Sequence, residues 1–337
     1  MAGEIHKVLV IGAGSIGERH IRCFLATGRC EVSFVEINET LRQTIAARYS
    51  ARSFASLEEG IAWRPKIAVI ATPAHLHIEM ATKLANAGIH LFIEKPLSTS
   101  ESGIVPLISL VRERNLFAGV AYVYRSHPVL SDMRKAILSG KFGRPVQIVV
   151  VAGQHFPTYR PAYREIYYRD RATGGGAIQD ALTHLITAGE WLVGPVTRLV
   201  ADAAHQVLPG VEVEDTVHIL TRHDNVLGNY SLNQHQAPNE TTLTVICERG
   251  TARFEVHGNR WQWMSSPGGV WQDGLSQLLE RDELFIRQAN LFLDAAEGQR
   301  PPTCNLTAGL QTLRVNLAAL RSVETGTWQT IPVEENT

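Results

Sequence analysis

Cysteine is scarce in this sequence. Four cysteines occur among 337 residues, at Cys23, Cys30, Cys247 and Cys304. No two of them form a CxxC pair, so their spacing predicts neither a zinc site nor a disulfide framework. Because disulfides belong to oxidising compartments, we expect a protein of the reducing cytoplasm.

Long hydrophobic runs and an excess of charge of one sign are also missing. No stretch reaches the roughly 18 apolar residues of a membrane span. The first apolar run, "KVLVI", is too short for a signal peptide and is followed at once by glycines. Lysine plus arginine number 32 and aspartate plus glutamate 33, for a net charge of −1. This balance predicts neither a nucleic-acid partner nor a membrane partner.

The composition is instead that of a folded protein long enough for two domains, with 45% hydrophobic and 19% charged residues. The first third of the chain alternates short apolar segments with helical patterns. Strands are predicted at residues 7–11, 31–36, 66–72, 89–94 and 116–122. This alternation predicts βαβ units and a parallel sheet.

The pattern changes near residue 123. Several strand-like runs with turn signals occupy residues 196–264, which predicts a mostly antiparallel sheet with one buried and one polar face. Helices are predicted at 128–139, 177–192, 280–297 and 307–322. We therefore expect one domain over residues 1–122 and a second α/β domain over residues 123–337.

A glycine-rich loop follows the first predicted strand. "VLVIGAGSIGERH" holds Gly12, Gly14 and Gly17 in GxGxxG spacing between a strand and a helix. This context suits a tight turn, close approach of a pyrophosphate, and phosphate binding at the helix N-terminus. Glu36 ends the second strand, where a carboxylate binds a ribose 2′-hydroxyl and repels a 2′-phosphate. We expect a dinucleotide-binding Rossmann domain that prefers NAD to NADP, a preference that Arg42 in the next helix would weaken.

With this loop in place, four segments together resemble the glucose–fructose oxidoreductase/inositol dehydrogenase (Gfo/Idh/MocA) family. They are "GAGSIGERH", "ATPAHLH" (71–77), Glu94-Lys95-Pro96 and "GGGAIQDALTHLI" (174–186). The resemblance implies a doubly wound Rossmann domain followed by an α/β domain for substrate binding and oligomerisation, with an open, mostly antiparallel sheet. It also implies a homodimer or homotetramer. Two positions depart from the family pattern, because Ala74 and Val123 stand where many members have asparagine.

The resemblance implies three catalytic residues, Lys95, Asp180 and His184. Lys95 follows a predicted strand at the edge where open α/β sheets bind ligands, and Pro96 favours an extended conformation for it. Asp180 and His184 stand four residues apart on a predicted helix and so share a face. We expect His184 to act as general base, Lys95 to stabilise the developing alkoxide, and Asp180 to orient the substrate or support His184.

Cofactor contacts are expected from the glycine loop and from the ends of the predicted strands. They are Gly12, Gly14, Ser15, Ile16, Gly17, Glu36, Thr72, Pro73, His77, Glu94 and Lys95. Substrate contacts are expected from tyrosines, which suit sugar rings, and arginines, which suit a carboxylate or phosphate. They are Tyr124, Arg125, Tyr163, Arg164 and Arg169, the last three in a stretch (154–171) whose spacing lines one face if it is helical. No metal is expected.

Three functions fit these features. The first is an NAD(P)-dependent dehydrogenase that transfers a hydride between the nicotinamide and a secondary alcohol or ketone of a sugar, polyol or sugar derivative. The second is an NAD-dependent glycosidase that oxidises, eliminates and rereduces its substrate. The third is a non-enzymatic protein that senses NAD or a sugar. The joint presence of Lys95, Asp180 and His184 favours an enzyme, and the first function is our prediction.

Overall fold

The computed structural model describes residues 5–280 and 282–333. The chain folds into two compact units, which are described separately. Unit 1 comprises Met1–Ser126 with Glu280–Leu310, and unit 2 comprises His127–Leu279 with Gln311–Thr337. The first crossing between the units lies close to the boundary predicted near residue 123. The return of residues 280–310 to unit 1 has no signal in the local sequence pattern.

Unit 1 is built on a six-stranded parallel sheet in the order β3-β2-β1-β4-β5-β6. The strands are β1 (His6–Ile11), β2 (Cys30–Val35), β3 (Arg52–Phe54), β4 (Ile67–Ile70), β5 (His90–Ile93) and β6 (Ala118–Val120). β4 is buried along its whole length because helices cover both faces of the sheet. All carboxyl ends of the strands lie at one edge, where the glycine loop and Lys95 also lie.

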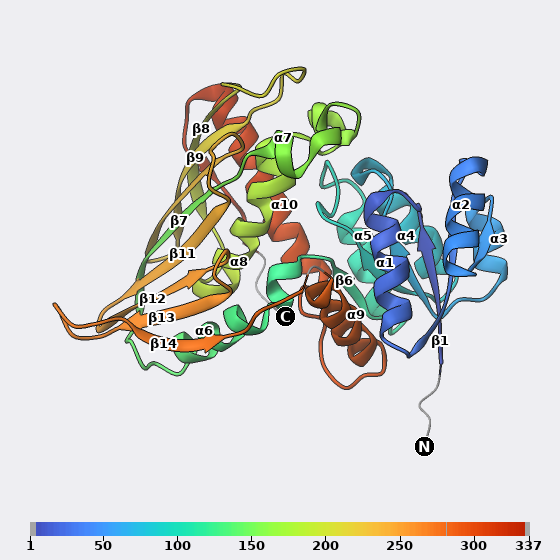
Figure 1. Cartoon of the computed structure of the whole chain (residues 1–337), viewed down its shortest axis with the longest axis horizontal. Helices are drawn as coiled ribbons and strands as arrows, with labels where there is room; N and C mark the ends of the chain where they lie inside the picture. Colours follow the sequence, from blue (N-terminus) through green and yellow to red (C-terminus); the bar gives the residue numbers. More distant parts are fainter. Residues whose placement is uncertain (1–4, 281, 334–337) are drawn as a thin grey trace. The chain divides into compact units, whose positions relative to one another are not determined.

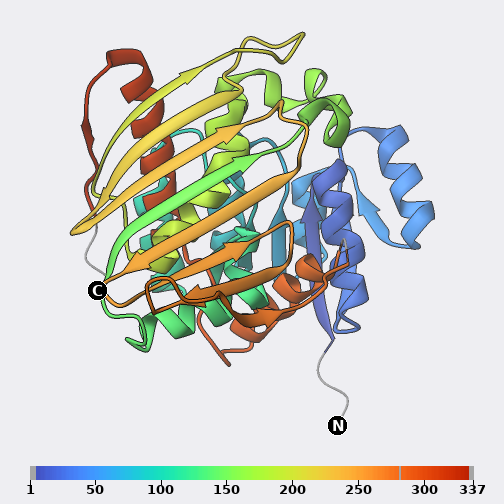
Figure 2. The same cartoon turned by 60° about the vertical axis from the view of Figure 1, so that its left-hand side comes forward.

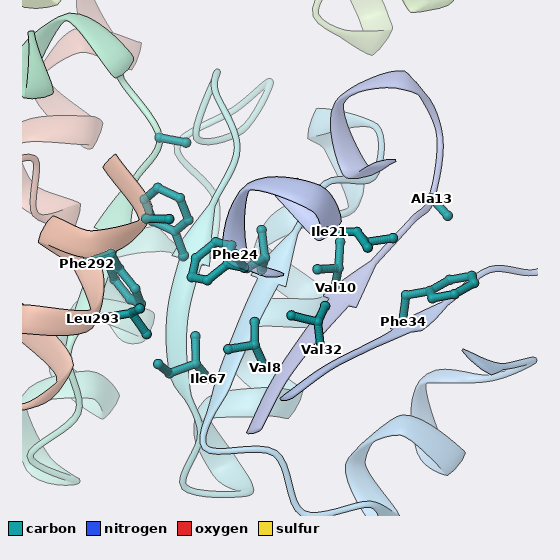
Figure 3. Packing of buried hydrophobic residues seen from close by; sticks show 14 of the residues in the cluster. Val8, Val10, Ala13, Ile21, Phe24, Val32, Phe34, Ile67, Phe292 and Leu293 are labelled. Carbon is teal, nitrogen blue, oxygen red and sulfur yellow. The ribbon is translucent and has the colours of Figure 1, made fainter. Parts of the chain in front are cut away.

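The helices of unit 1 follow the predicted alternation. They are α1 (Ser15–Ala26), α2 (Glu39–Tyr49), α3 (Leu57–Ala62), α4 (His77–Asn86), α5 (Ile104–Glu113) and α9 (Glu283–Ala296). Figure 3 shows how α9 reaches the core of this unit, with Phe292 and Leu293 packed beside Phe24 of α1 and Ile67 of β4. Hydrophobic contact therefore accounts for the return of residues 280–310 to unit 1.

Unit 2 is built on a nine-stranded sheet in the order β14-β13-β12-β11-β7-β10-β9-β8-β15. Its strands are β7 (Pro145–Gly153), β8 (Arg198–Ala204), β9 (Thr216–His223), β10 (Val226–Asn233), β11 (Glu240–Cys247), β12 (Gly250–Glu255), β13 (Arg260–Met264), β14 (Gln272–Ser276) and β15 (Gln329–Thr330). Only the β7–β10 pair is parallel, so the predicted fold class is confirmed.

One face of this nine-stranded sheet carries the longer helices of unit 2. They are α6 (Pro128–Leu138), α8 (Thr183–Val193) and α10 (Leu306–Thr325), of which α10 begins in unit 1. Figures 1 and 2 show these helices on one side of the sheet and no helix on the other. In the part of the chain that the structure describes, no helix has both the length and the apolar character needed to cross a membrane.

Residues 154–176 differ from a single helix. They form the short α7 (Phe156–Tyr159) and separate 3-10 turns at Pro161–Arg164, Tyr167–Arg169 and Arg171–Thr173. A proline at position 161 and positive φ angles at Gly174 and Gly176 interrupt helical hydrogen bonding here. The i, i+4 spacing of tyrosines and arginines in this stretch therefore lines no common helix face.

Candidate active site

The glycine loop has the shape that a dinucleotide requires. A Cβ added to Gly17 would lie 1.9 Å from the Gly12 carbonyl oxygen, so only glycine allows α1 to pack against the loop. A Cβ added to Gly14 would meet nothing within 4 Å, which leaves open space beside the backbone. Gly14 caps α1 without a side-chain hydrogen bond, so the N–H groups of the first turn, at Ser15 and Ile16, face no capping group. The loop therefore fits a pyrophosphate.

Glu36 closes the other side of this loop. Its Oε2 accepts a hydrogen bond from the Ala13 N–H at 2.9 Å, and its Oε1 accepts one from the Asn38 N–H at 2.9 Å. Arg42 donates its guanidinium to the Glu36 carbonyl oxygen at 2.7 Å, so this positive charge is bound to the main chain. The next residue, Ile37, is 86% exposed. The end of β2 thus presents a fixed carboxylate beside an exposed apolar side chain.

His77 joins the segments that follow β4 and β5. Its Nε2 lies 2.8 Å from the Thr72 carbonyl oxygen and its Nδ1 lies 3.1 Å from the Pro96 carbonyl oxygen. Burial lowers the pKa of the His77 imidazole, while these carbonyls and the Glu94 carboxylate oppose that decrease. Thr72 and Pro73 follow β4 after Ala71, and a cis peptide bond joins Lys95 to Pro96. Both predicted segments therefore meet at the carboxyl edge of the sheet.

Glu94 and Lys95 follow β5 at the same edge. The Glu94 side chain is buried, and its Oε1 lies 2.6 Å from His20 Nε2 of α1. Its Oε2 accepts the Lys95 N–H at 3.0 Å. Burial opposes ionisation of this carboxyl, but the hydrogen bonds and charges of His20 and Lys95 prevail and lower its pKa. Lys95 itself is half-buried. Glu94 and Lys95 therefore both lie at the carboxyl edge of the sheet, where the dinucleotide loop also lies.

In unit 2, Asp180 and His184 lie at the start of a long helix. Asp180 belongs to a π-helical turn, Ile178–Leu182, that runs directly into α8, where His184 is the second residue. Such π-turns are rare and often occur at functional sites. Asp180 is buried, and its Oδ1 accepts a hydrogen bond from the Tyr167 hydroxyl at 2.6 Å. His184 is half-buried. Tyr167 therefore orients the Asp180 carboxylate.

A buried glutamate holds the start of this π-turn. Glu214 Oε1 accepts the Ile178 N–H at 3.2 Å, and its Oε2 accepts Arg171 Nε at 2.8 Å. Gly176 has a φ of +86°, and a Cβ added to it would lie 2.4 Å from Glu214 Oε1. The glycine run before Asp180 therefore serves a close approach between main chain and carboxylate.

The predicted substrate residues lie in different surroundings. Tyr124 and Arg125 of the 3-10 turn Val123–Ser126 are half-buried in unit 1. In unit 2, Arg169 is exposed. Tyr163 is only 1% exposed within an aromatic cluster, and its hydroxyl donates to the Pro209 carbonyl oxygen at 2.7 Å. Arg164 donates its Nε to the same carbonyl at 2.8 Å. The Tyr163 side chain thus packs inside unit 2, while Arg169 is open to ligands.

Two family models match this chain. The model described as "Oxidoreductase family, NAD-binding Rossmann fold" matches residues 6–122, and the "GFO/IDH/MocA C-terminal domain" matches residues 130–253. The chain belongs to the GFO/IDH/MocA oxidoreductase family. The predictions of the family, of an oxidoreductase, and of NAD as the cofactor of its Rossmann domain are confirmed.

Two relatives of this GFO/IDH/MocA oxidoreductase are dehydrogenases named for a sugar substrate. Levoglucosan dehydrogenase of Pseudarthrobacter phenanthrenivorans is 26% identical over 286 residues, which cover 75% of this chain and 71% of the relative. UDP-N-acetylglucosamine 3-dehydrogenase of Acidithiobacillus ferrooxidans is 24% identical over 328 residues, covering 94% of this chain and 96% of the relative.

Solved structures show the same fold. Levoglucosan dehydrogenase in complex with NADH has a TM-score of 0.89 at 22% identity, covering 98% of this chain and 100% of the other. The WlbA dehydrogenase from Bordetella pertussis, in complex with NADH and UDP-GlcNAcA, has a TM-score of 0.84 at 24% identity, covering 99% and 100%.

Sequence reasoning missed three residues of this oxidoreductase. They are His20, Ile37 and Glu214. His20 follows the glycine loop in the quoted segment "GAGSIGERH", and a histidine on the buried face of α1 is the signal that could have drawn attention to it. Across residues 5–280 and 282–333, no group of three or more His, Cys, Asp or Glu side chains could hold a metal ion.

Proposed function

We propose that this oxidoreductase transfers a hydride between NAD and a secondary alcohol or ketone carbon of a sugar, polyol or sugar derivative. The position of Lys95 carries the proposal. Lys95 follows the carboxyl end of β5, at the same edge of the sheet as the loop shaped for a dinucleotide. Asp180 and His184 support it, since they provide a carboxylate and an imidazole at a π-turn. The sugar-active relatives support the substrate class.

In this proposal, the N–H groups of α1's first turn, at Ser15 and Ile16, bind the pyrophosphate, with Gly12, Gly14 and Gly17 shaping the loop. The Glu36 carboxylate binds the adenosine ribose hydroxyls, and Ile37 covers the adenine with its exposed apolar side chain. Thr72 and Pro73 line the same edge. Bound NAD supplies a carbon that accepts the hydride from the substrate.

His184 acts as general base in alcohol oxidation. Its imidazole accepts the proton of the substrate hydroxyl as the hydride leaves the carbon, and returns the proton in ketone reduction. The Lys95 ammonium donates a hydrogen bond to the same oxygen and stabilises its developing negative charge. Asp180, held by Tyr167, accepts a hydrogen bond from the substrate or from His184.

The substrate class is a polyhydroxylated ring. The proposed substrate contacts are Tyr124 and Arg125, which are half-buried, and Arg169, which is exposed. An arginine suits a carboxylate or phosphate on a sugar. Acidic or nucleotide-linked sugars are therefore expected to have a lower KM than neutral polyols.

The test is a screen for NADH formation with NAD and a set of alcohols. The set contains levoglucosan, myo-inositol, UDP-N-acetylglucosamine and a UDP-linked sugar acid. Lys95→Met and His184→Gln are expected to lower kcat by about 100-fold or more, while the Kd for NADH measured by fluorescence is unchanged. Near-normal turnover in both variants would overturn the assignment. Turnover of a glycoside without net NADH would indicate the glycosidase instead.

We also propose that the open face of the nine-stranded sheet pairs with a second copy of this chain. Val151, Leu220 and Leu227 project from adjacent strands of this face, and each is more than 45% exposed. The registers place Leu220 and Val149 on either side of Asn229. A face with exposed apolar side chains can complement itself about a two-fold axis, as in most homodimers.

Light scattering after size-exclusion chromatography tests this pairing. Leu220→Arg is expected to shift the protein to a smaller species. Val207→Arg, at an equally exposed residue outside these strands, is the matched control and should leave the mass unchanged. An unchanged mass for Leu220→Arg would refute the pairing.

A further inference from the structure

The carboxylate of Glu94 binds the main chain of Lys95 rather than standing free at the strand end. It is 6% exposed, and each of its two oxygens already accepts a hydrogen bond within unit 1. One oxygen faces His20, which is 74 residues away on α1, and the other faces the N–H of the very next residue. Glu94 thus connects the first helix of the dinucleotide fold to the backbone of Lys95.

A second contact holds the backbone on the carbonyl side of Lys95, at Pro96. The carbonyl oxygen of Pro96 lies 3.1 Å from His77 Nδ1, and the other ring nitrogen of His77 lies 2.8 Å from the Thr72 carbonyl. The backbone is therefore held on the N–H side of Lys95 and at the carbonyl of the following proline. Both contacts come from side chains that are nearly inaccessible to solvent.

We propose that Glu94, held by His20, is a positioning residue that sets where the Lys95 side chain begins and in which direction it points. This role rests on the proposed function, in which the Lys95 ammonium stabilises the alkoxide. It replaces the direct cofactor contact expected for Glu94 from the sequence. His77 acts with it by fixing the carbonyl of Pro96.

The reason lies in the length of the lysine side chain. Four methylene groups give it many rotamers, so its ammonium is well placed only if its backbone is well placed. A misplacement of about 1 Å costs on the order of 100-fold in rate. A stability role explains Glu94 less well, because a buried ion pair contributes little net stability compared with apolar residues of the same volume.

A double-mutant cycle in kcat separates positioning from a general structural role. The cycle uses the best substrate of the screen and combines Glu94→Ala with Lys95→Met. In the Lys95 background, Glu94→Ala is expected to lower kcat by about 100-fold. In the Lys95→Met background, it should change kcat by no more than about twofold, because the side chain through which it acts is gone. Glu94→Gln keeps an oxygen for the Lys95 N–H and should retain most of the activity.

Amide hydrogen exchange gives a readout that needs no turnover. The Lys95 amide should exchange about tenfold faster or more in Glu94→Ala, because its acceptor is lost, and nearly as slowly as wild type in Glu94→Gln. The Kd for NADH should stay the same in both. Glu79→Ala is the matched control, since Glu79 is an exposed glutamate of unit 1 that pairs with Lys83 on the surface of α4. It should change neither kcat nor exchange.

The outcomes separate this inference from the proposed function. If Glu94→Ala lowers kcat equally in both backgrounds, or leaves kcat unchanged while Lys95→Met abolishes it, the positioning role is wrong and the function stands. If Lys95→Met turns over normally, the proposed function is wrong. If Glu94→Ala does not fold, His20→Ala takes its place in the same cycle. His20→Ala keeps the Glu94 carboxylate but removes the side chain that holds it. In the Lys95→Met background, His20→Ala should likewise leave kcat nearly unchanged.

Discussion

The stability of unit 2 should depend on pH through one buried histidine. His223 is 2% exposed at the end of β9. Its Nδ1 donates to the Gly194 carbonyl oxygen at 2.7 Å, and its Nε2 lies 3.2 Å from the Tyr230 hydroxyl. This arrangement suits the neutral ring, with one nitrogen as donor and the other as acceptor. Burial lowers the pKa of His223 to about 4, from an ordinary value of 6.5, although the Gly194 carbonyl opposes this.

The sign and the size of the effect follow from linkage. Between pH 6.5 and about 4 the unfolded chain binds a proton at this position and the folded chain does not. The contribution of His223 to stability is therefore complete above pH 6.5 and decreases as the pH falls toward 4. A difference of about 2.5 pKa units at 1.36 kcal/mol per unit corresponds to about 3 kcal/mol of unfolding free energy.

Urea unfolding at fixed protein concentration, repeated at several pH values across this range, measures the effect. His223→Gln keeps a hydrogen-bond donor for Gly194 but does not titrate, so its unfolding free energy should decrease less than that of wild type as the pH falls. His218→Gln, at an exposed position of the same strand, is the matched control and should follow the wild-type curve. Parallel curves for wild type and His223→Gln would refute the reasoning.

Three further predictions follow from the two units. Glu36→Ser removes the carboxylate that would repel a 2′-phosphate, and should raise kcat/KM with NADP relative to NAD by about tenfold or more; an unchanged ratio contradicts it. Tyr167→Phe removes a hydrogen bond to the Asp180 carboxylate, which we propose acts in catalysis, and should lower kcat by about tenfold, with the Kd for NADH unchanged. Gly176→Ala places a Cβ against Glu214 and should cost about 2 kcal/mol or more in unfolding free energy. Gly140→Ala, also at positive φ but with open space around it, should cost less.

The order of strands and helices in the first domain could be predicted from the sequence. The predicted strands 7–11 and 31–36 overlap β1 and β2. Apolar periodicity and glycine positions act over a few residues, so they are visible in the local pattern. The glycine loop, Glu36 and Lys95 belong to such local motifs, which is why they could be named without coordinates.

The remaining features depend on contacts between distant parts of the chain, which only the tertiary structure decided. His20 meets Glu94 across 74 residues, and Glu214 reaches Ile178 across 36. Helix α9 joins unit 1 because Phe292 fits beside Phe24. The tyrosines and arginines of residues 154–171 lie on separate turns, because Pro161 interrupts the helical hydrogen bonding of this stretch. A local pattern specifies which residues are buried or extended, but the packing of the whole unit determines which group a buried polar side chain contacts.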